Sequence, residues 1–85
     1  MAQIEIYTSP LCGFCFRAKR LLDAKGLAYT EINVLGDRQA KAEMVQRADG
    51  RTSVPQIFID GKGVGGSDDL AALESSGALD RMLAA

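Results

Sequence analysis

The first 34 residues carry a strand pattern, a helix pattern and a second strand pattern in succession. Apolar and polar side chains alternate over residues 4–7 and again over residues 28–34. Between them, residues 16–26 place apolar side chains at helical spacing and end on a glycine, which favours the left-handed cap of a helix. Because a helix between two strands of one sheet joins them in parallel with a right-handed crossover, this order predicts an α/β fold.

A second helix and an antiparallel hairpin are expected next. Residues 56–60 and 62–65 are strand patterns on either side of an Asp-Gly pair, the dipeptide that favours a two-residue hairpin turn. Such a hairpin adds antiparallel neighbours to the parallel pair, so the predicted sheet is mixed and four-stranded. The preceding helix has Asp37 as its predicted N-cap, and its apolar side carries Ala40, Met44, Val45 and Ala48.

Two further helices are predicted at the C-terminal end. Ser67 is the expected N-cap of a helix that ends at Gly77, and residues 78–85 form a short terminal helix. Together with the earlier helices, these are expected to cover both faces of the sheet. At 85 residues the chain is near the lower limit for a self-sufficient core, so we expect a single domain over residues 1–85.

Charge and hydropathy narrow the classes of partner. The chain has 10 basic and 11 acidic residues, a net charge of −1, and no basic stripe suited to a nucleic-acid backbone. No run of about 20 apolar residues is present, so no membrane span is expected. The first residues lack the pattern of a secretory signal, and we therefore expect a cytoplasmic protein. In that compartment a Cys-x-x-Cys pair is more often catalytic or metal-binding than structural.

Cys12 and Cys15 are the only cysteines, and they lie between the first predicted strand and the first predicted helix. On a helical turn, a spacing of three residues brings two cysteines close enough for a disulfide. Cys12 is expected at the helix N-terminus, where free backbone N–H groups and the helix dipole stabilise a thiolate, the attacking species in exchange. Cys15 is expected one turn further in and more buried. These positions favour Cys12 as the nucleophile and Cys15 as the resolving thiol.

The alternatives for this pair are two incidental core cysteines and a structural metal site. An intrachain zinc site needs four ligands, whereas the chain offers two sulfurs and no histidine. We therefore expect no metal site within one chain.

Four landmarks resemble the glutaredoxin family over essentially the full chain. The segment IYT leads into Cys-Gly-Phe-Cys at residues 12–15, RTSVPQIFI begins at Arg51, GVGGSDDL begins at Gly63, and the length is typical of small bacterial members. The resemblance implies a thioredoxin fold and a glutathione-dependent oxidoreductase that reduces protein–glutathione mixed disulfides and other disulfides. It also implies that glutathione is the co-substrate of a monomer whose partners are glutathionylated or disulfide-containing proteins.

The family resemblance also places a glutathione site. In the family the proline at Pro55 is cis, which exposes the backbone N–H and C=O of Val54 to an extended peptide such as the cysteinyl part of glutathione. The predicted glutathione-binding residues are Phe14, Arg51, Ser53, Val54, Pro55, Gln56, Gly66, Ser67 and Asp68.

Within this set, the two ends of glutathione are assigned to different residues. By resemblance, Ser67 and Asp68 contact the γ-glutamyl end, although plain helix capping is an alternative role for both. Arg51 and Gln56 resemble positions that reach the glycyl carboxylate. For Arg51, a solvated loop charge is the alternative.

Two positions depart from the family pattern. Gly13-Phe14 stands where Pro-Tyr or Ser-Tyr is usual, and Ser9 stands where the family places a lysine that aids thiolate formation and binds the glycyl carboxylate. Because glycine relaxes the turn beside Cys12, a second function is considered, namely carrying an iron-sulfur cluster between two chains. Cys12 of each chain and two glutathione thiolates would be the ligands in such a homodimer. A third candidate is a thioredoxin-like electron donor to ribonucleotide reductase.

Overall fold

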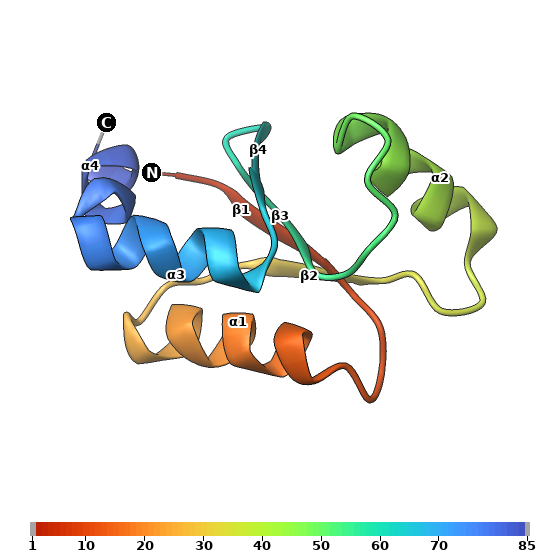
Figure 1. Ribbon diagram of the computed structural model, residues 1–85, viewed down its shortest axis with the longest axis horizontal. Helices are drawn as coiled ribbons and strands as arrows, with labels where there is room; N and C mark the ends of the chain where they lie inside the picture. The colour runs from red at the N-terminus through yellow and green to blue at the C-terminus, as the bar shows by residue number, and fades with distance from the viewer. Residues whose placement is uncertain (1, 85) are drawn as a thin grey trace.

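The computed structural model describes residues 2–84, which form a four-stranded sheet flanked by helices (Figure 1). The strand order is β2-β1-β3-β4, in which β1 and β2 are parallel and the other two pairs are antiparallel. The predicted mixed sheet is therefore confirmed. The elements are β1 (Ile4–Thr8), α1 (Gly13–Ala24), β2 (Thr30–Asn33), α2 (Arg38–Arg47), β3 (Gln56–Ile59), β4 (Lys62–Gly65), α3 (Ser67–Ser76) and α4 (Ala78–Ala84).

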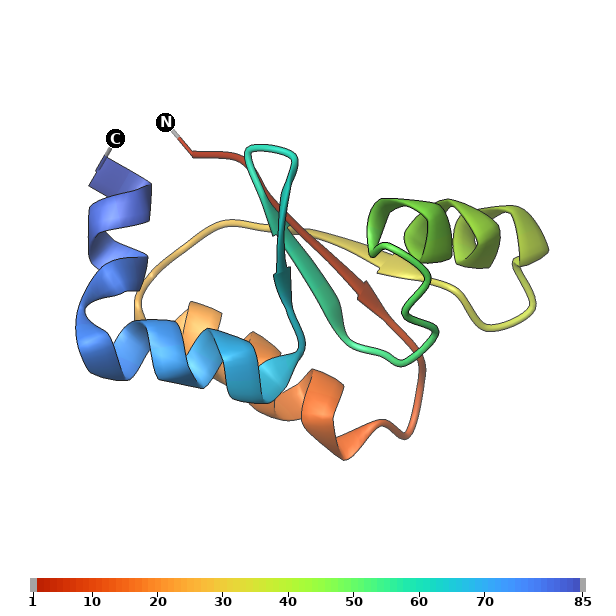
Figure 2. The ribbon, with the colours of Figure 1, turned by 45° about the horizontal axis from the view of Figure 1, so that its top comes forward.

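The sheet separates two apolar cores, and helices cover both of its faces as predicted (Figure 2). On the face covered by α1 and α3, Ile6 of β1 packs with Leu22 and Leu70. On the opposite face, covered by α2, Tyr7 packs with Met44. Successive side chains of a strand point to opposite faces, so the alternation in β1 decides which helix each residue meets.

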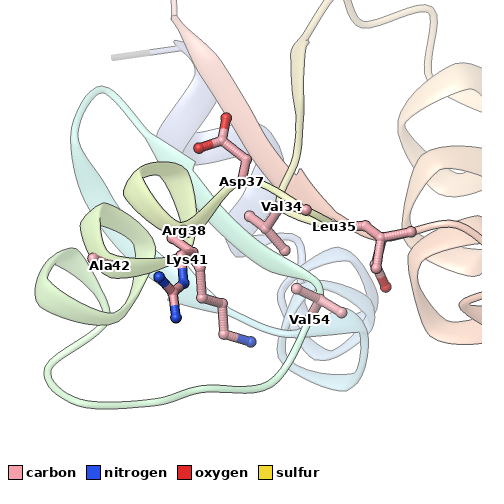
Figure 3. Close-up of a pocket in the computed structure, with 9 residues that line it drawn as sticks. Val34, Leu35, Asp37, Arg38, Lys41, Ala42 and Val54 are labelled. Atoms are coloured by element: carbon pink, nitrogen blue, oxygen red, sulfur yellow. The ribbon is translucent and has the colours of Figure 1, made fainter.

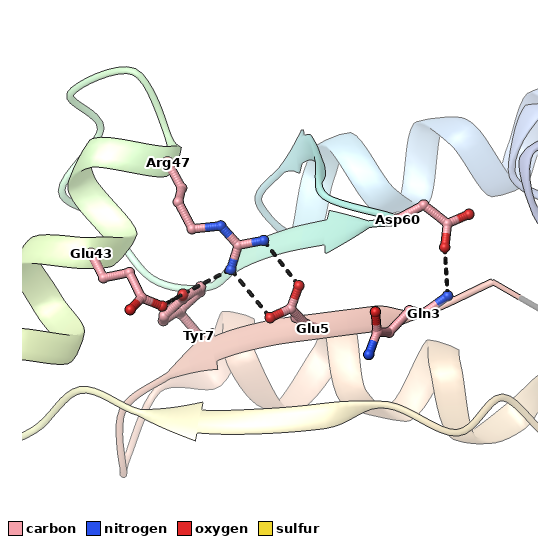
Figure 4. A network of polar contacts seen from close by, with 6 residues as sticks. All are labelled: Gln3, Glu5, Tyr7, Glu43, Arg47 and Asp60. Atoms are coloured by element: carbon pink, nitrogen blue, oxygen red, sulfur yellow. Dashed lines mark hydrogen bonds and ion pairs between the residues drawn. The ribbon is translucent and has the colours of Figure 1, made fainter.

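A polar network fixes α2 against the sheet (Figure 4). The Arg47 guanidinium donates to Glu5 (Nη2 to Oε1, 2.9 Å) and to the Tyr7 hydroxyl (2.9 Å), and its Cζ lies 4.1 Å from the centroid of the Phe58 ring. The Tyr7 hydroxyl donates in turn to Glu43. A half-buried ion pair needs such additional hydrogen bonds to offset its desolvation. The network anchors α2 to β1, the strand that ends just before the cysteines.

Two helix starts differ from the sequence prediction. α1 begins at Gly13 rather than at residue 16, because Cys12 takes the N-cap position. For α3 the N-cap is Gly66, and Ser67, which was expected there, is the first residue of the helix. The reason is Asp69, whose carboxylate accepts the Gly66 backbone N–H at 2.9 Å and closes the helix one residue earlier.

Other predicted boundaries are confirmed. Asp37 caps α2 by accepting the Ala40 backbone N–H at 2.9 Å, and Gly77 ends α3 with a φ of 80°. Asp60 and Gly61 both have positive φ, as a two-residue turn of type I′ requires. Within residues 2–84, no helix has both the length and the apolar character needed to cross a bilayer.

Candidate active site

The sulfur of Cys12 is held between backbone groups of two segments. Its Sγ accepts the backbone N–H of Cys15 at 3.1 Å, and the thiol donates to the carbonyl oxygen of Val54 at a sulfur–oxygen distance of 3.8 Å. As the N-cap of α1, Cys12 lies where the unpaired N–H groups of a helix favour a negative charge. Both cysteines are free thiols, and Cys12 is the one that is partly open to solvent.

Cys15 is enclosed in the core, with an exposed fraction of 2%. Burial, followed by the hydrogen bond with Cys12, raises the pKa of the Cys15 thiol to about 11, although a hydrogen bond with the Ser9 backbone and the charge of Lys19 oppose this. Burial has this effect because a low-dielectric surrounding disfavours the charged form of an acid. Cys15 therefore keeps its proton at neutral pH, and the sequence prediction that it is the more buried of the two thiols is confirmed.

The loop before β3 lies against the cysteines. The Val54–Pro55 peptide bond is cis, as the family resemblance predicts. Because the Val54 carbonyl contacts the Cys12 thiol, the cis peptide bond faces the cysteine pair. The backbone of Val54 is thus in contact with the Cys12 sulfur.

A cavity of about 230 Å³ has Val54 in its lining. Its lining includes Asp69, which sequence reasoning did not select. The other lining residues are all predicted glutathione-binding residues, namely Phe14, Arg51, Ser53, Val54, Pro55, Gly66, Ser67 and Asp68. The structure therefore brings together side chains from α1, the loop before β3 and the start of α3.

Asp69 organises the polar end of this cavity. Besides capping Gly66, its Oδ2 lies 3.6 Å from Nη1 of Arg51. Gly65 lies next to this pair and has a φ of 110°. A Cβ at this position would overlap the Asp69 carboxylate. An acidic residue in the first turn of a predicted helix, three residues after a glycine, was the sequence signal for this role.

Gln56 lies outside this cavity. Its side chain is buried, and Nε2 donates to the backbone carbonyl of Ser53 at 3.0 Å. This bond closes the loop that carries Val54 and Pro55. The structure therefore places Gln56 where it supports the loop, and a direct contact with glutathione stays a prediction.

A larger cavity of about 730 Å³ also has Val54 in its lining (Figure 3). Ser9, the residue in place of the family lysine, is part of its lining. The side chains of Arg38 and Lys41 extend from α2 and line this cavity, and Lys41 extends toward Val54. Lys41 also donates to the backbone carbonyl of Thr52 at 2.6 Å. The remaining lining is Val34, Leu35, Gly36, Asp37 and Ala42.

Sequence reasoning missed the two cations of this cavity. Arg38 and Lys41 are three residues apart, so they share one side of a helix, but the sequence alone does not show that this side faces the cysteine loop. Among residues 2–84, no three His, Cys, Asp or Glu side chains form a group that could hold a metal ion.

This arrangement has the parts that thiol–disulfide exchange requires. A partly accessible thiol lies at a helix N-terminus, a second thiol is buried one turn away, and the backbone of Val54 adjoins the first. The attacking species in such exchange is a thiolate, and the second thiol can displace a partner from the first.

Comparisons with known proteins agree with this chemistry. The sequence model of the glutaredoxin family matches residues 4–64. Glutaredoxin 3 of Escherichia coli K12 is 49% identical over 83 residues, which cover 98% of this chain and 99% of that protein. The solution structure of glutaredoxin from Brucella melitensis has a TM-score of 0.84 at 48% identity, covering 98% of this chain and 89% of that one.

A third relative was solved with a ligand. The crystal structure of the buckwheat glutaredoxin–glutathione complex has a TM-score of 0.86 at 30% identity and covers 98% of this chain and 77% of that one. These structural neighbours confirm the predicted thioredoxin fold. The chain therefore belongs to the glutaredoxin family of thiol–disulfide oxidoreductases.

Proposed function

We propose that this protein uses glutathione to reduce protein–glutathione mixed disulfides and other disulfides, with Cys12 as the nucleophile. The observation that carries the proposal is the position of the Cys12 sulfur. It contacts the carbonyl of Val54, and Val54 lines both cavities, so a peptide joined to Cys12 through a disulfide and paired with Val54 would have a cavity at hand for each of its ends. The reaction draws on a pool of reduced glutathione, which is consistent with a cytoplasmic location.

The first step consumes one disulfide bond and forms another. The Cys12 thiolate attacks the glutathione sulfur of the substrate, the sulfur–sulfur bond breaks, and the substrate protein leaves as a thiolate that then takes a proton. Cys12 is left in a mixed disulfide with glutathione. The thiolate of a second glutathione attacks the bound glutathione sulfur, which releases oxidised glutathione and restores the Cys12 thiolate.

Cys15 provides the alternative second step. Its thiolate attacks the Cys12 sulfur, forms the Cys12–Cys15 disulfide and releases reduced glutathione. Because burial raises the pKa of the Cys15 thiol to about 11, few molecules carry this thiolate at neutral pH. The dithiol route is therefore expected to be the slower one for glutathionylated substrates, and to matter chiefly for protein disulfides.

The smaller cavity is the proposed site of the γ-glutamyl end of glutathione. The backbone N–H groups at the start of α3 suit its α-carboxylate, and the Asp68 carboxylate suits its ammonium group. Arg51 lies in this same cavity and is paired with Asp69. In this orientation the Arg51 guanidinium would contact the γ-glutamyl end of glutathione. The resemblance instead assigns Arg51 to the glycyl end.

The glycyl end is then expected on the other side of Val54. An extended peptide that pairs with the Val54 backbone runs from the smaller cavity into the larger one. There, Arg38 and Lys41 supply positive charge beside Ser9. We propose that these two side chains hold the glycyl carboxylate in the absence of the family lysine.

Variants of the two cysteines test the proposal in a glutathione-coupled assay. Cys12→Ser is expected to abolish reduction of every substrate. Cys15→Ser is expected to retain deglutathionylation and to lose most reduction of protein disulfides. Substantial activity of Cys12→Ser would show that the roles are wrongly assigned. The iron-sulfur carrier and the electron donor to ribonucleotide reductase stay predictions, and the residues of the smaller cavity favour glutathione over the latter.

A further inference from the structure

The outward side of α1 carries two arginines between two phenylalanines. Phe14 and Phe16 are 57% and 60% exposed, which is unusual for aromatic side chains. The Arg17 Cζ lies 5.7 Å from the centroid of the Phe14 ring, and the Arg20 Cζ lies 5.8 Å from that of Phe16. At helical spacing these four residues form one strip, which we call the α1 strip. Figure 1 shows α1 at the outer edge of the molecule, and all four side chains of the α1 strip are exposed.

The arginines of the α1 strip have no acidic partner in the part of the chain that the structure describes. Two other cations along α1 are paired, since Lys19 contacts Glu31 at 3.0 Å and Lys25, the C-cap, contacts Asp80 at 2.7 Å. The ion pairs among residues 2–84 include neither Arg17 nor Arg20. The strip is thus a local excess of positive charge on a chain whose net charge is −1.

The position of the α1 strip ties it to the reaction. Phe14 lines the proposed glutathione cavity, and the helix begins directly after Cys12. When glutathione occupies that cavity, the protein part of a mixed disulfide must extend outward from the same sulfur pair. Aromatic and arginine side chains are the residues most enriched where proteins contact one another.

We propose that the α1 strip is the docking surface for the polypeptide part of the substrate, and that it selects segments with acidic residues beside the modified cysteine. Charge complementarity is the argument for this occupant, because two unpaired guanidinium groups favour carboxylates and disfavour lysines. The rings supply apolar contact, and the arginine planes supply hydrogen bonds. This inference rests on the proposed function.

Matched glutathionylated peptides test the inference. One peptide has acidic residues on both sides of the modified cysteine, a second has lysines at the same positions, and the mixed disulfide of glutathione with 2-mercaptoethanol is the small reference substrate. For two exposed charge pairs, kcat/KM is expected to be about five- to tenfold higher for the acidic peptide at low salt. This preference is expected to shrink as the ionic strength rises, since the charges are exposed.

Substitutions in the α1 strip test whether the preference for the acidic peptide arises there. The double variant Arg17→Gln, Arg20→Gln is expected to reduce the acidic preference to less than about twofold, while the rate with the small substrate is unchanged. Phe16→Ala, which removes a ring outside the glutathione cavity, is expected to raise KM for the acidic peptide about threefold. The matched control is Arg81→Gln on α4, at the opposite end of the molecule from the start of α1, and it is expected to leave the preference intact.

These experiments distinguish failure of the docking surface from failure of the proposed glutathione-dependent activity. If the small substrate is not reduced by the wild-type protein, the proposed function itself fails. If it is reduced but the two peptides react equally, or the double variant keeps the acidic preference, the docking surface is refuted. Sedimentation that shows a dimer of the wild-type protein and a monomer of the double variant would instead assign the α1 strip to self-association, and would also overturn the inference.

Discussion

Replacing Gly65 by alanine tests the polar end of the smaller cavity, the proposed glutathione site. The alanine Cβ would overlap the Asp69 carboxylate and lie 3.0 Å from Nη1 of Arg51, and it would occupy a backbone with a φ of 110°. A left-handed conformation costs a residue with a side chain about 1–2 kcal/mol. Displacing Asp69 also breaks its bond to the Gly66 N–H, and loss of a helix cap costs about 1 kcal/mol. The expected loss in the free energy of unfolding is therefore about 2–3 kcal/mol.

Urea denaturation followed by circular dichroism measures this loss. With a slope of about 1 kcal/mol per molar urea, the midpoint is expected to fall by about 2–3 M. Gly13→Ala is the matched control, because a Cβ at Gly13 meets nothing within 4 Å and Gly13 is the first residue of α1. Alanine there is expected to change the free energy of unfolding by no more than about 0.5 kcal/mol. Equal midpoints for the two variants would refute the argument that Gly65 makes room for Asp69.

Two further predictions concern the cysteines. Since the pKa of the Cys15 thiol is raised from 9.0 to about 11, the buried thiol contributes stability that is fully present below pH 9 and is lost as the pH rises through about 11. The wild-type protein is therefore expected to lose more stability than Cys15→Ser between pH 9 and 11 in urea titrations, and parallel curves would contradict it. Ser9→Lys is expected to speed alkylation of Cys12 by iodoacetamide at pH 6, because a nearby cation stabilises the thiolate. An unchanged rate would show that residue 9 does not reach the sulfur.

The fold was predictable from the sequence because its signals are local. The alternation in residues 4–7, the Asp60-Gly61 turn and the cap at Asp37 each report on a few neighbouring residues, and all are found in the structure. The start of α3 was placed one residue late, since Ser67 and Gly66 are both acceptable caps and the choice depends on the carboxylate of Asp69.

The site was predictable only in part. Resemblance supplied most of the residues in the smaller cavity, but it does not show which of them face each other. Arg51 and Gln56 were grouped by resemblance, whereas the structure points one toward Asp69 and the other toward the Ser53 carbonyl. Arg38 and Lys41 come from a helix far from the cysteines in the chain, and only the packing of α2 on the sheet brings them to Val54.

Asp69 couples the shape of the proposed glutathione cavity to the start of α3. One carboxylate caps Gly66, pairs with Arg51 and occupies the space that a side chain at Gly65 would need. The Asp69 carboxylate therefore contacts both the first turn of α3 and the loop before β3, and so it fixes the position of one relative to the other. Because the Asp69–Arg51 pair is half exposed, its direct contribution to stability is small. Its importance lies instead in where it places the cavity walls, so that substitution of Asp69 should disturb glutathione binding more than folding.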